Sequence, residues 1–259
     1  MLTQLFKAKK PFIGFITAGD GGIDYCVECC LQLIAGGVDI LEIGLPFSDP
    51  VADGITIQQS SQRALQRGMN PLMVLEIAKR VRRESSVPLI LFSYFNPLLQ
   101  QGFEYLKLAK NSGFDALIVV DMAPIDNALF NQYEVLIERA GLQLIYLLTP
   151  STSEERIQMI TQKARGFLYY ACQKGTTGIR TALPQDVDQR IQVIKKYTTL
   201  PVAVGFGIAD RLQAEKLLNF ADGFVVGSAF VKQMSDNVEP IKLRYLAQSI
   251  DPRGLLCKQ

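Results

Sequence analysis

The chain of 259 residues contains no histidine. Metal sites built on imidazole are therefore excluded, and so is every catalytic triad that uses histidine as its base. Any general acid or base in this protein must be a carboxylate, a tyrosine, a lysine or a cysteine. Low-complexity tracts are also absent, so residues 1–259 are expected to form one large domain.

The chain has neither a large excess of one sign of charge nor a long apolar run. The chain carries 27 lysines and arginines against 25 aspartates and glutamates, a net charge of +2. The basic residues are scattered, which argues against nucleic acid as a main partner. No apolar run could span a bilayer, and residues 1–10 lack the apolar core of a signal peptide. We therefore expect a cytoplasmic protein with no membrane partner.

Cysteine is scarce, and three of the five cysteines lie close together. Cys26, Cys29 and Cys30 have a spacing similar to that of a metal or redox motif. They lie within an amphipathic helical pattern, however, and no second pair of ligands accompanies them. We interpret these cysteines as helix packing residues and predict no metal site.

Short apolar segments typical of strands alternate with amphipathic segments typical of helices. Eight such units predict an α/β fold, a (β/α)₈ TIM barrel, with residues 1–9 as an extra N-terminal helix. An open doubly wound sheet is the rival fold, but Gly19–Gly22 does not fit a dinucleotide-binding glycine loop. Strands are expected at 11–18, 38–45, 89–95, 116–122, 143–148, 166–172, 202–206 and 223–226. Helices are expected at about 23–36, 57–67, 71–83, 127–140, 153–163, 186–197, 210–219 and 236–249. Another helix is expected to begin at Asn96-Pro97, with Asn96 as its N-cap and Pro97 as its first-turn proline.

One charged residue interrupts the second expected strand. Period-2 alternation places Glu42 on one face with Ile40 and Gly44, and the other face carries Leu41 and Ile43. In a parallel sheet both faces are buried, so Glu42 would lie in apolar surroundings. Burial disfavours the charged form and raises the pKa of this carboxyl toward the range useful for proton transfer. A buried ion pair is the alternative interpretation.

Active sites of such barrels lie at the carboxyl ends of the strands. Small residues follow the last two expected strands, in Gly205-Phe206-Gly207 and Gly227-Ser228. Their backbone N–H groups can approach an anion closely, and together they predict a phosphate site. The loop at 173–178 fits either a lid over a phosphorylated substrate or a plain surface connection.

Three further polar residues could have either a structural or a functional role. Asp53 and Asp49 lie in a loop after the second expected strand, where aspartate is first of all a turn residue. Tyr169 falls on the sixth expected strand, on the face of Ala171 and Gln173, and tyrosine is common in barrel cores. Composition and spacing leave these alternatives open.

Residues 41–54, reading Leu-Glu-Ile-Gly-Leu-Pro-Phe-Ser-Asp-Pro-Val-Ala-Asp-Gly, closely resemble the signature of the tryptophan synthase alpha subunit family. The similarity covers essentially the whole chain. It extends to Phe15–Asp20, Tyr94–Pro97, Thr176–Gly178, Gly205–Ile208 and Gly227–Ala229.

The resemblance implies a lyase that cleaves indole-3-glycerol phosphate to indole and glyceraldehyde 3-phosphate. It also implies a tryptophan synthase beta subunit as partner, in an α₂β₂ assembly. Pyridoxal phosphate would belong to that partner, and this chain would need neither cofactor nor metal. The implied catalytic residues are Glu42, Asp53 and Tyr169; the substrate contacts are Phe15, Thr177, Gly178, Phe206, Gly207, Gly227 and Ser228; and Asp49, Asn96 and Pro97 would serve loop closure or partner contact.

The chain departs from the family pattern in three loops, after the expected strands one, four and six. These departures motivate a second hypothesis, a catalytically weak alpha-like subunit that mainly activates the beta subunit. A third hypothesis is a Schiff-base aldolase that uses Lys174, although Glu42 and Asp53 would then have no purpose.

Overall fold

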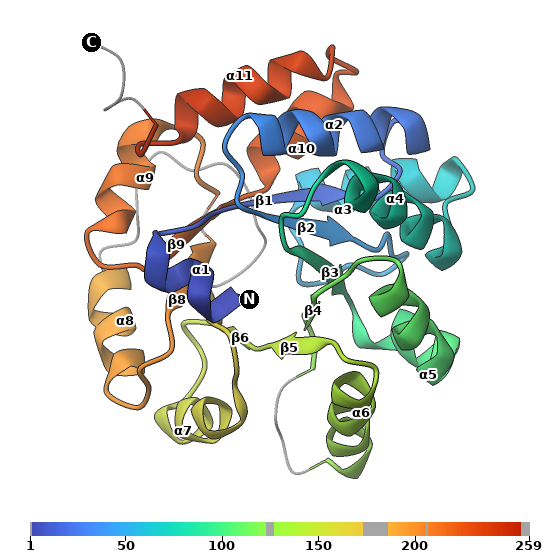
Figure 1. Cartoon of the computed structure of the whole chain (residues 1–259). Helices are drawn as coiled ribbons and strands as arrows, with labels where there is room; N and C mark the ends of the chain where they lie inside the picture. The colour runs from blue at the N-terminus through green and yellow to red at the C-terminus, as the bar shows by residue number, and fades with distance from the viewer. Residues whose placement is uncertain (1, 123–126, 173–185, 206, 255–259) are drawn as a thin grey trace.

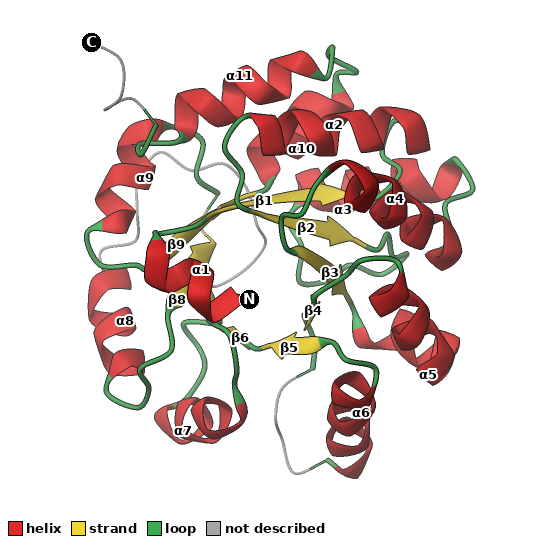
Figure 2. Cartoon of the chain, viewed as in Figure 1, coloured by secondary structure: helices red, strands yellow, loops and turns green. Residues whose placement is uncertain are grey.

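The structure is a computed structural model that describes residues 2–122, 127–172, 186–205 and 207–254. Nine parallel strands form one sheet in the order β5-β4-β3-β2-β1-β9-β8-β7-β6, surrounded by helices (Figures 1 and 2). The strands are β1 (Phe12–Thr17), β2 (Ile40–Gly44), β3 (Leu89–Ser93), β4 (Ala116–Val119), β5 (Gln143–Ile145), β6 (Leu147–Leu148), β7 (Leu168–Ala171), β8 (Val202–Gly205) and β9 (Gly223–Val226). The helices are α1 (Leu2–Ala8), α2 (Ile23–Ala35), α3 (Ile55–Gln66), α4 (Pro71–Glu84), α5 (Phe95–Asn111), α6 (Ala128–Arg139), α7 (Glu154–Lys163), α8 (Val187–Lys195), α9 (Arg211–Leu218), α10 (Ser228–Ser235) and α11 (Ile241–Ile250).

The fifth position of the barrel is shared by β5 and β6, which are separated only by Tyr146. β5 pairs with β4 in the register Ile118↔Ile145, whereas β6 pairs with β7 in the register Leu147↔Tyr169. The Tyr169 N–H also donates to the Tyr146 carbonyl, at 3.0 Å. One continuous segment thus bonds to both neighbours in turn, so the sheet comes close to closing on itself. The predicted (β/α)₈ barrel is confirmed.

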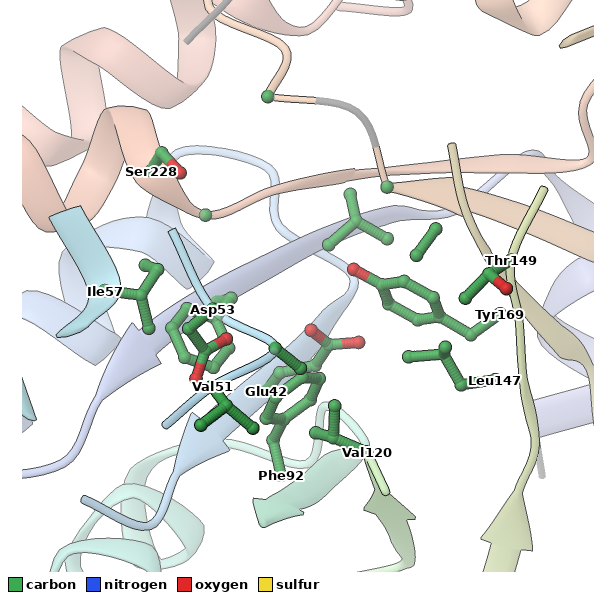
Figure 3. A pocket seen from close by; sticks show the side chains of 17 residues that line it. Glu42, Val51, Asp53, Ile57, Phe92, Val120, Leu147, Thr149, Tyr169 and Ser228 are labelled. Carbon is green, nitrogen blue, oxygen red and sulfur yellow. The ribbon is translucent and has the colours of Figure 1, made fainter. Parts of the chain in front are cut away.

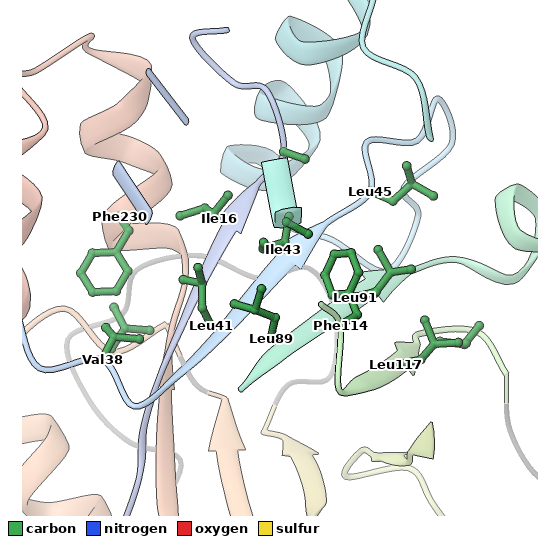
Figure 4. Packing of buried hydrophobic residues seen from close by; sticks show 14 of the residues in the cluster. Ile16, Val38, Leu41, Ile43, Leu45, Leu89, Leu91, Phe114, Leu117 and Phe230 are labelled. Carbon is green, nitrogen blue, oxygen red and sulfur yellow. The ribbon is translucent and has the colours of Figure 1, made fainter. Parts of the chain in front are cut away.

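Alternation along the strands divides the buried residues into two sets. Ile40 belongs to the cluster inside the barrel. Leu41 and Ile43 belong to the outer cluster, between the sheet and the helices (Figure 4). The interior is closed below by α1, whose Phe6 ring lies 4.9 Å from the Phe167 ring. The period-2 interpretation of this strand is therefore confirmed, and so is the extra N-terminal helix.

The cysteine cluster lies on α2. Cys26, Cys29 and Cys30 are fully buried free thiols that pack in the core between this helix and the barrel. Their interpretation as packing residues is confirmed. None of the helices in the described ranges combines the length and apolarity needed to cross a bilayer.

Two expectations about helix ends were wrong. Asn96 is not an N-cap, because α5 begins at Phe95 and its N-cap is Tyr94. The Phe95 N–H donates instead to Oδ1 of Asp121, at 2.7 Å, so a carboxylate from the next strand's loop replaces the local cap. Pro97 does lie in the first turn.

The expected helix at 236–249 is also corrected. Only α11 falls in that range, and it begins at Ile241; a separate helix that was not expected, α10, begins at Ser228 directly after β9 and ends at Ser235. Between them Asn237 adopts a φ of 48°, a left-handed conformation that interrupts the helical path. Ser228 therefore lies at a helix N-terminus rather than in a loop.

Candidate active site

A cavity of about 350 Å³ opens at the carboxyl ends of the strands (Figure 3). Residues from all eight positions of the barrel, from the loops that follow the strands and from the first turns of α3 and α10 form its wall. They are Phe15, Glu42, Val51, Ala52, Asp53, Ile57, Phe92, Val120, Leu147, Thr149, Tyr169, Ala171, Gly205, Gly207, Val225, Gly227 and Ser228.

Glu42 provides the most deeply buried carboxyl group of this wall. Its side chain projects from β2 into the barrel, and the residue is only 1% exposed. Oε1 has no hydrogen-bond partner among the described residues. Burial alone raises the pKa of Glu42 from 4.5 to about 8. Figure 3 shows this carboxyl between Phe92 and Tyr169, directed into the cavity.

Asp53 approaches the same cavity from the loop between β2 and α3. The backbone of this loop is fixed, because the Asp53 N–H donates to the Pro50 carbonyl and Gln58 Nε2 donates to the Asp53 carbonyl. The Tyr94 hydroxyl donates to Oδ2 of Asp53 at 3.0 Å. Burial raises the pKa of Asp53 from 3.8 to about 6, although the Tyr94 hydrogen bond opposes the shift. The pKa of Asp53 therefore lies below that of Glu42.

Tyr169 projects into the cavity from β7. Burial, together with the neighbouring Glu42 carboxyl, raises the pKa of this phenol well above its ordinary value, so it stays protonated. Its hydroxyl packs closely against the backbone of Gly205 on β8: a β-carbon at position 205 would lie 2.4 Å from Oη. Glycine at 205 is what makes room for the tyrosine in this position.

The opposite end of the cavity is formed by small residues after β8 and β9. Gly207, Gly227 and Ser228 line it, and Ser228 is the first residue of α10. The N–H groups in the first turn of a helix, with the positive end of the helix dipole, favour an anion. Gly207 has a φ of 55°, which favours glycine.

The cavity thus brings together most of the predicted site residues. Phe15 lines it as well, with its ring edge-to-face against Phe92 at 5.1 Å. Three predicted residues do not line it: Asp49, an exposed loop residue, and Asn96 and Pro97, in the first turn of α5. Thr177, Gly178 and Phe206 lie outside the described residues.

Several lining residues were not anticipated from the sequence. Phe92 could have been found, because period 2 within the expected strand 89–95 places it two residues after the buried Ile90. Thr149, Val120 and Leu147 carry no comparable signal, because their place depends on how neighbouring strands align. Among the described residues no three metal-ligating side chains cluster together.

Comparison with known proteins settles the family. A sequence model described as "Tryptophan synthase alpha chain" matches residues 2–250. The chain belongs to this family. Tryptophan synthase alpha chains from Chlamydia felis and Coxiella burnetii are 52% and 43% identical to it, over 96% and 97% of this chain and 97% of each relative.

Solved structures agree with this assignment. The tryptophan synthase alpha subunit of Legionella pneumophila superposes with a TM-score of 0.84 at 33% identity, covering 96% of this chain and 95% of that one. A Mycobacterium tuberculosis tryptophan synthase gives a TM-score of 0.87 at 28% identity, covering 96% and 95%. The family reaction is cleavage of indole-3-glycerol phosphate, so this alpha chain is a carbon–carbon lyase of tryptophan biosynthesis.

Replacing the buried carboxyl should change how stability depends on pH. The pKa of Glu42 is about 8 in the folded chain and 4.5 without burial, so between these values the folded state holds a proton that the unfolded chain has lost. The free energy of unfolding therefore falls as pH rises between these two values, by up to about 1.4 kcal/mol per pH unit. Glu42→Gln should therefore gain stability over the parent chain as pH rises from 5 to 8.

Urea unfolding across this pH range measures the effect. Glu76→Gln, a change of the same kind at an exposed helix position, is the control and should show no such trend. A stability difference for Glu42→Gln that stays constant from pH 5 to 8 would contradict the burial argument.

Substitution of Gly205 should disturb the tyrosine. The methyl group of Gly205→Ala would overlap the Tyr169 hydroxyl and force the ring to shift within the cavity. A displacement of about 1 Å at a reacting site lowers turnover on the order of a hundredfold. Steady-state cleavage of indole-3-glycerol phosphate measures this loss. Gly254→Ala, where the added methyl group meets open space, should leave turnover unchanged; equal activity of the two variants would refute the assigned contact.

Proposed function

We propose that Glu42 is the acid and base of the cleavage. The observation that carries this proposal is its carboxyl group, buried in the cavity wall with Oε1 unpartnered among the described residues. A pKa of about 8 keeps the group protonated at neutral pH, as the first step requires.

Glu42 would act twice. It first delivers its proton to C3 of the indole ring. It then removes the proton of the neighbouring glycerol hydroxyl while the bond between C3 and the glycerol carbon breaks. The electron pair of that bond returns to the ring and restores the aromatic indole, and the hydroxyl oxygen becomes the carbonyl of glyceraldehyde 3-phosphate. The same carboxyl ends the cycle protonated, so no other proton carrier is required.

Asp53 would stabilise the charge that this protonation creates. Positive charge develops on the indole nitrogen when C3 takes up a proton, and a carboxylate that accepts the ring N–H offsets it. With a pKa of about 6, Asp53 is mostly ionised at neutral pH, whereas Glu42 is mostly neutral. Two carboxyls in different surroundings thus take different roles. Tyr169 would orient the substrate beside Glu42, and Phe15 would pack against the indole ring.

The phosphate would bind at the N-terminus of α10. Gly207, Gly227 and Ser228 line that end of the cavity, and a helix N-terminus with small residues suits a phosphate group. Resemblance to the family adds Thr177, Gly178 and Phe206 as substrate contacts, although these residues lie outside the described part of the chain.

We further propose that a beta subunit docks on the carboxyl face of the barrel. Val51, Ile55, Leu99 and Leu129 are exposed there, by 78%, 62%, 39% and 42%. Val51 lies in the loop after β2, and the other three lie in the first two turns of α3, α5 and α6, respectively. All four therefore share the face that carries the cavity. Exposed apolar side chains on one face are typical of a protein interface.

Asp49 lies in the loop after β2, and Asn96 and Pro97 lie in the first turn of α5. We propose that these three residues contact the partner. The assembly would be α₂β₂, with pyridoxal phosphate held by the beta subunit and none by this chain, and it would be cytoplasmic. These points rest on the family, whose solved structures include a Mycobacterium tuberculosis tryptophan synthase.

Removing the Glu42 carboxylate should abolish cleavage. We expect Glu42→Gln to lower turnover by at least about a thousandfold, because Glu42 is the one carboxyl in the described cavity wall that is mostly protonated at neutral pH. Asp53→Asn should lose about a hundredfold, since one charge-stabilising acceptor is lost. Steady-state cleavage of indole-3-glycerol phosphate, with and without a beta subunit, is the measurement, and near-normal turnover by Glu42→Gln would overturn the mechanism. Absence of turnover in the unaltered chain, with stimulation of the beta subunit preserved, would favour the weakly catalytic alternative.

A charge on the exposed apolar face should weaken the complex. Ile55→Asp should lower affinity for the beta subunit by about tenfold or more, because the carboxylate must be desolvated on docking. The fold should tolerate it, since an acidic residue suits the first position of a helix. Tyr245→Asp on α11, at equal exposure of 62%, is the control. Calorimetric titration with the beta subunit decides; equal affinities would place the interface elsewhere.

A further inference from the structure

Tyr94 lies beside the cavity but is not part of its wall. It follows β3 as the N-cap of α5 and is 3% exposed. Its hydroxyl takes part in two hydrogen bonds with the loop between β2 and α3. It accepts the Ala52 N–H at 3.0 Å and donates to Oδ2 of Asp53 at 3.0 Å.

The first of these bonds fixes the direction of the second. Because the Tyr94 oxygen accepts the Ala52 N–H, its own proton points toward Asp53. Donation by the backbone also polarises the hydroxyl and strengthens the bond that it makes. The carboxyl of Asp53 is thereby held as a hydrogen-bond acceptor through Oδ2, and no side-chain hydrogen bond to Oδ1 is found within the described residues.

The tyrosine itself is held rigidly. Its ring packs against Phe47 with centroids 5.2 Å apart, and the Ser93 hydroxyl donates to its carbonyl at 2.9 Å. The next residue, Phe95, is anchored by Asp121 through its N–H. Tyr94 therefore connects a fixed strand end with a carboxylate in a loop.

We propose that Tyr94 is the positioning residue for Asp53, orienting its carboxylate toward the indole nitrogen and favouring its ionised form. This inference rests on the role proposed above for Asp53. The titratable groups facing the pair are Tyr169, beside Asp53, and Asp121, beside Tyr94. Neither replaces the phenol: Asp121 accepts the Phe95 N–H, and no hydrogen bond joins Asp121 or Tyr169 to Asp53 in the described residues.

Tyr94→Phe tests the inference, since it removes only the hydroxyl and keeps the ring against Phe47. We expect kcat for cleavage to fall by about tenfold to a hundredfold, the usual effect of losing one hydrogen bond to a charged group. KM should change little, because the phosphate end is untouched. The acidic limb of the pH–rate profile should move to higher pH, since loss of a donor raises the pKa of Asp53 further.

Tyr105→Phe is the matched control. Tyr105 is 2% exposed, donates its hydroxyl to the Pro71 carbonyl at 3.1 Å and does not line the cavity. This variant loses a buried hydroxyl of the same kind, so it reports any purely structural cost. We expect its kcat and pH profile to match those of the unaltered chain.

Two measurements separate failure of this inference from failure of the proposed function. Carbon-13 NMR of the Asp53 carboxyl reads its pKa without any turnover, and this pKa should rise in Tyr94→Phe but not in Tyr105→Phe. In kinetics, Asp53→Asn combined with Tyr94→Phe should be no slower than Asp53→Asn alone. Normal kcat and an unshifted Asp53 pKa in Tyr94→Phe would overturn the inference, even if Asp53→Asn is impaired. Full turnover by Asp53→Asn would instead overturn the role of Asp53 and the inference with it.

Discussion

Burial of one carboxyl group inside the barrel is the constraint on which the site depends. Ile40 lies below Glu42 on the same strand face, and the interior beneath is filled by Ile13, Phe167 and the side chains of α1. Water therefore cannot reach the carboxyl from the amino end of the strands. The apolar interior raises the pKa of Glu42. On the other side the carboxyl lines the cavity, where a bound ligand could contact it.

The fold gives two carboxyls two different environments. Glu42 sits on a strand whose position is fixed by ladders on both sides. Asp53 sits in a loop, accepts a hydrogen bond from Tyr94 and keeps a lower pKa. The proton transfer proposed for Glu42 and the charge stabilisation proposed for Asp53 need these two states at the same pH. Because the strand and the loop are consecutive in the chain, one segment of about a dozen residues supplies both groups.

The sequence was informative where local chemistry decides the structure. A glutamate within an alternating apolar strand predicts its own burial, and the glycines after the last two strands do line the cavity. It failed where distant residues decide. Asp121 reaches across from another loop to cap α5, so Asn96 is not needed as a cap. The hydrogen bond between Tyr94 and Asp53 joins residues 41 positions apart, and no spacing rule predicts it.

The most direct test of this account is the titration of Glu42 itself. Carbon-13 labelling of the glutamate side chains, with Glu42→Gln to assign the resonance, allows its pKa to be read by NMR in the folded chain. The account predicts a midpoint near pH 8. A midpoint near 4.5, the value of a solvated glutamate, would mean that water reaches the carboxyl and would contradict the proposed chemistry.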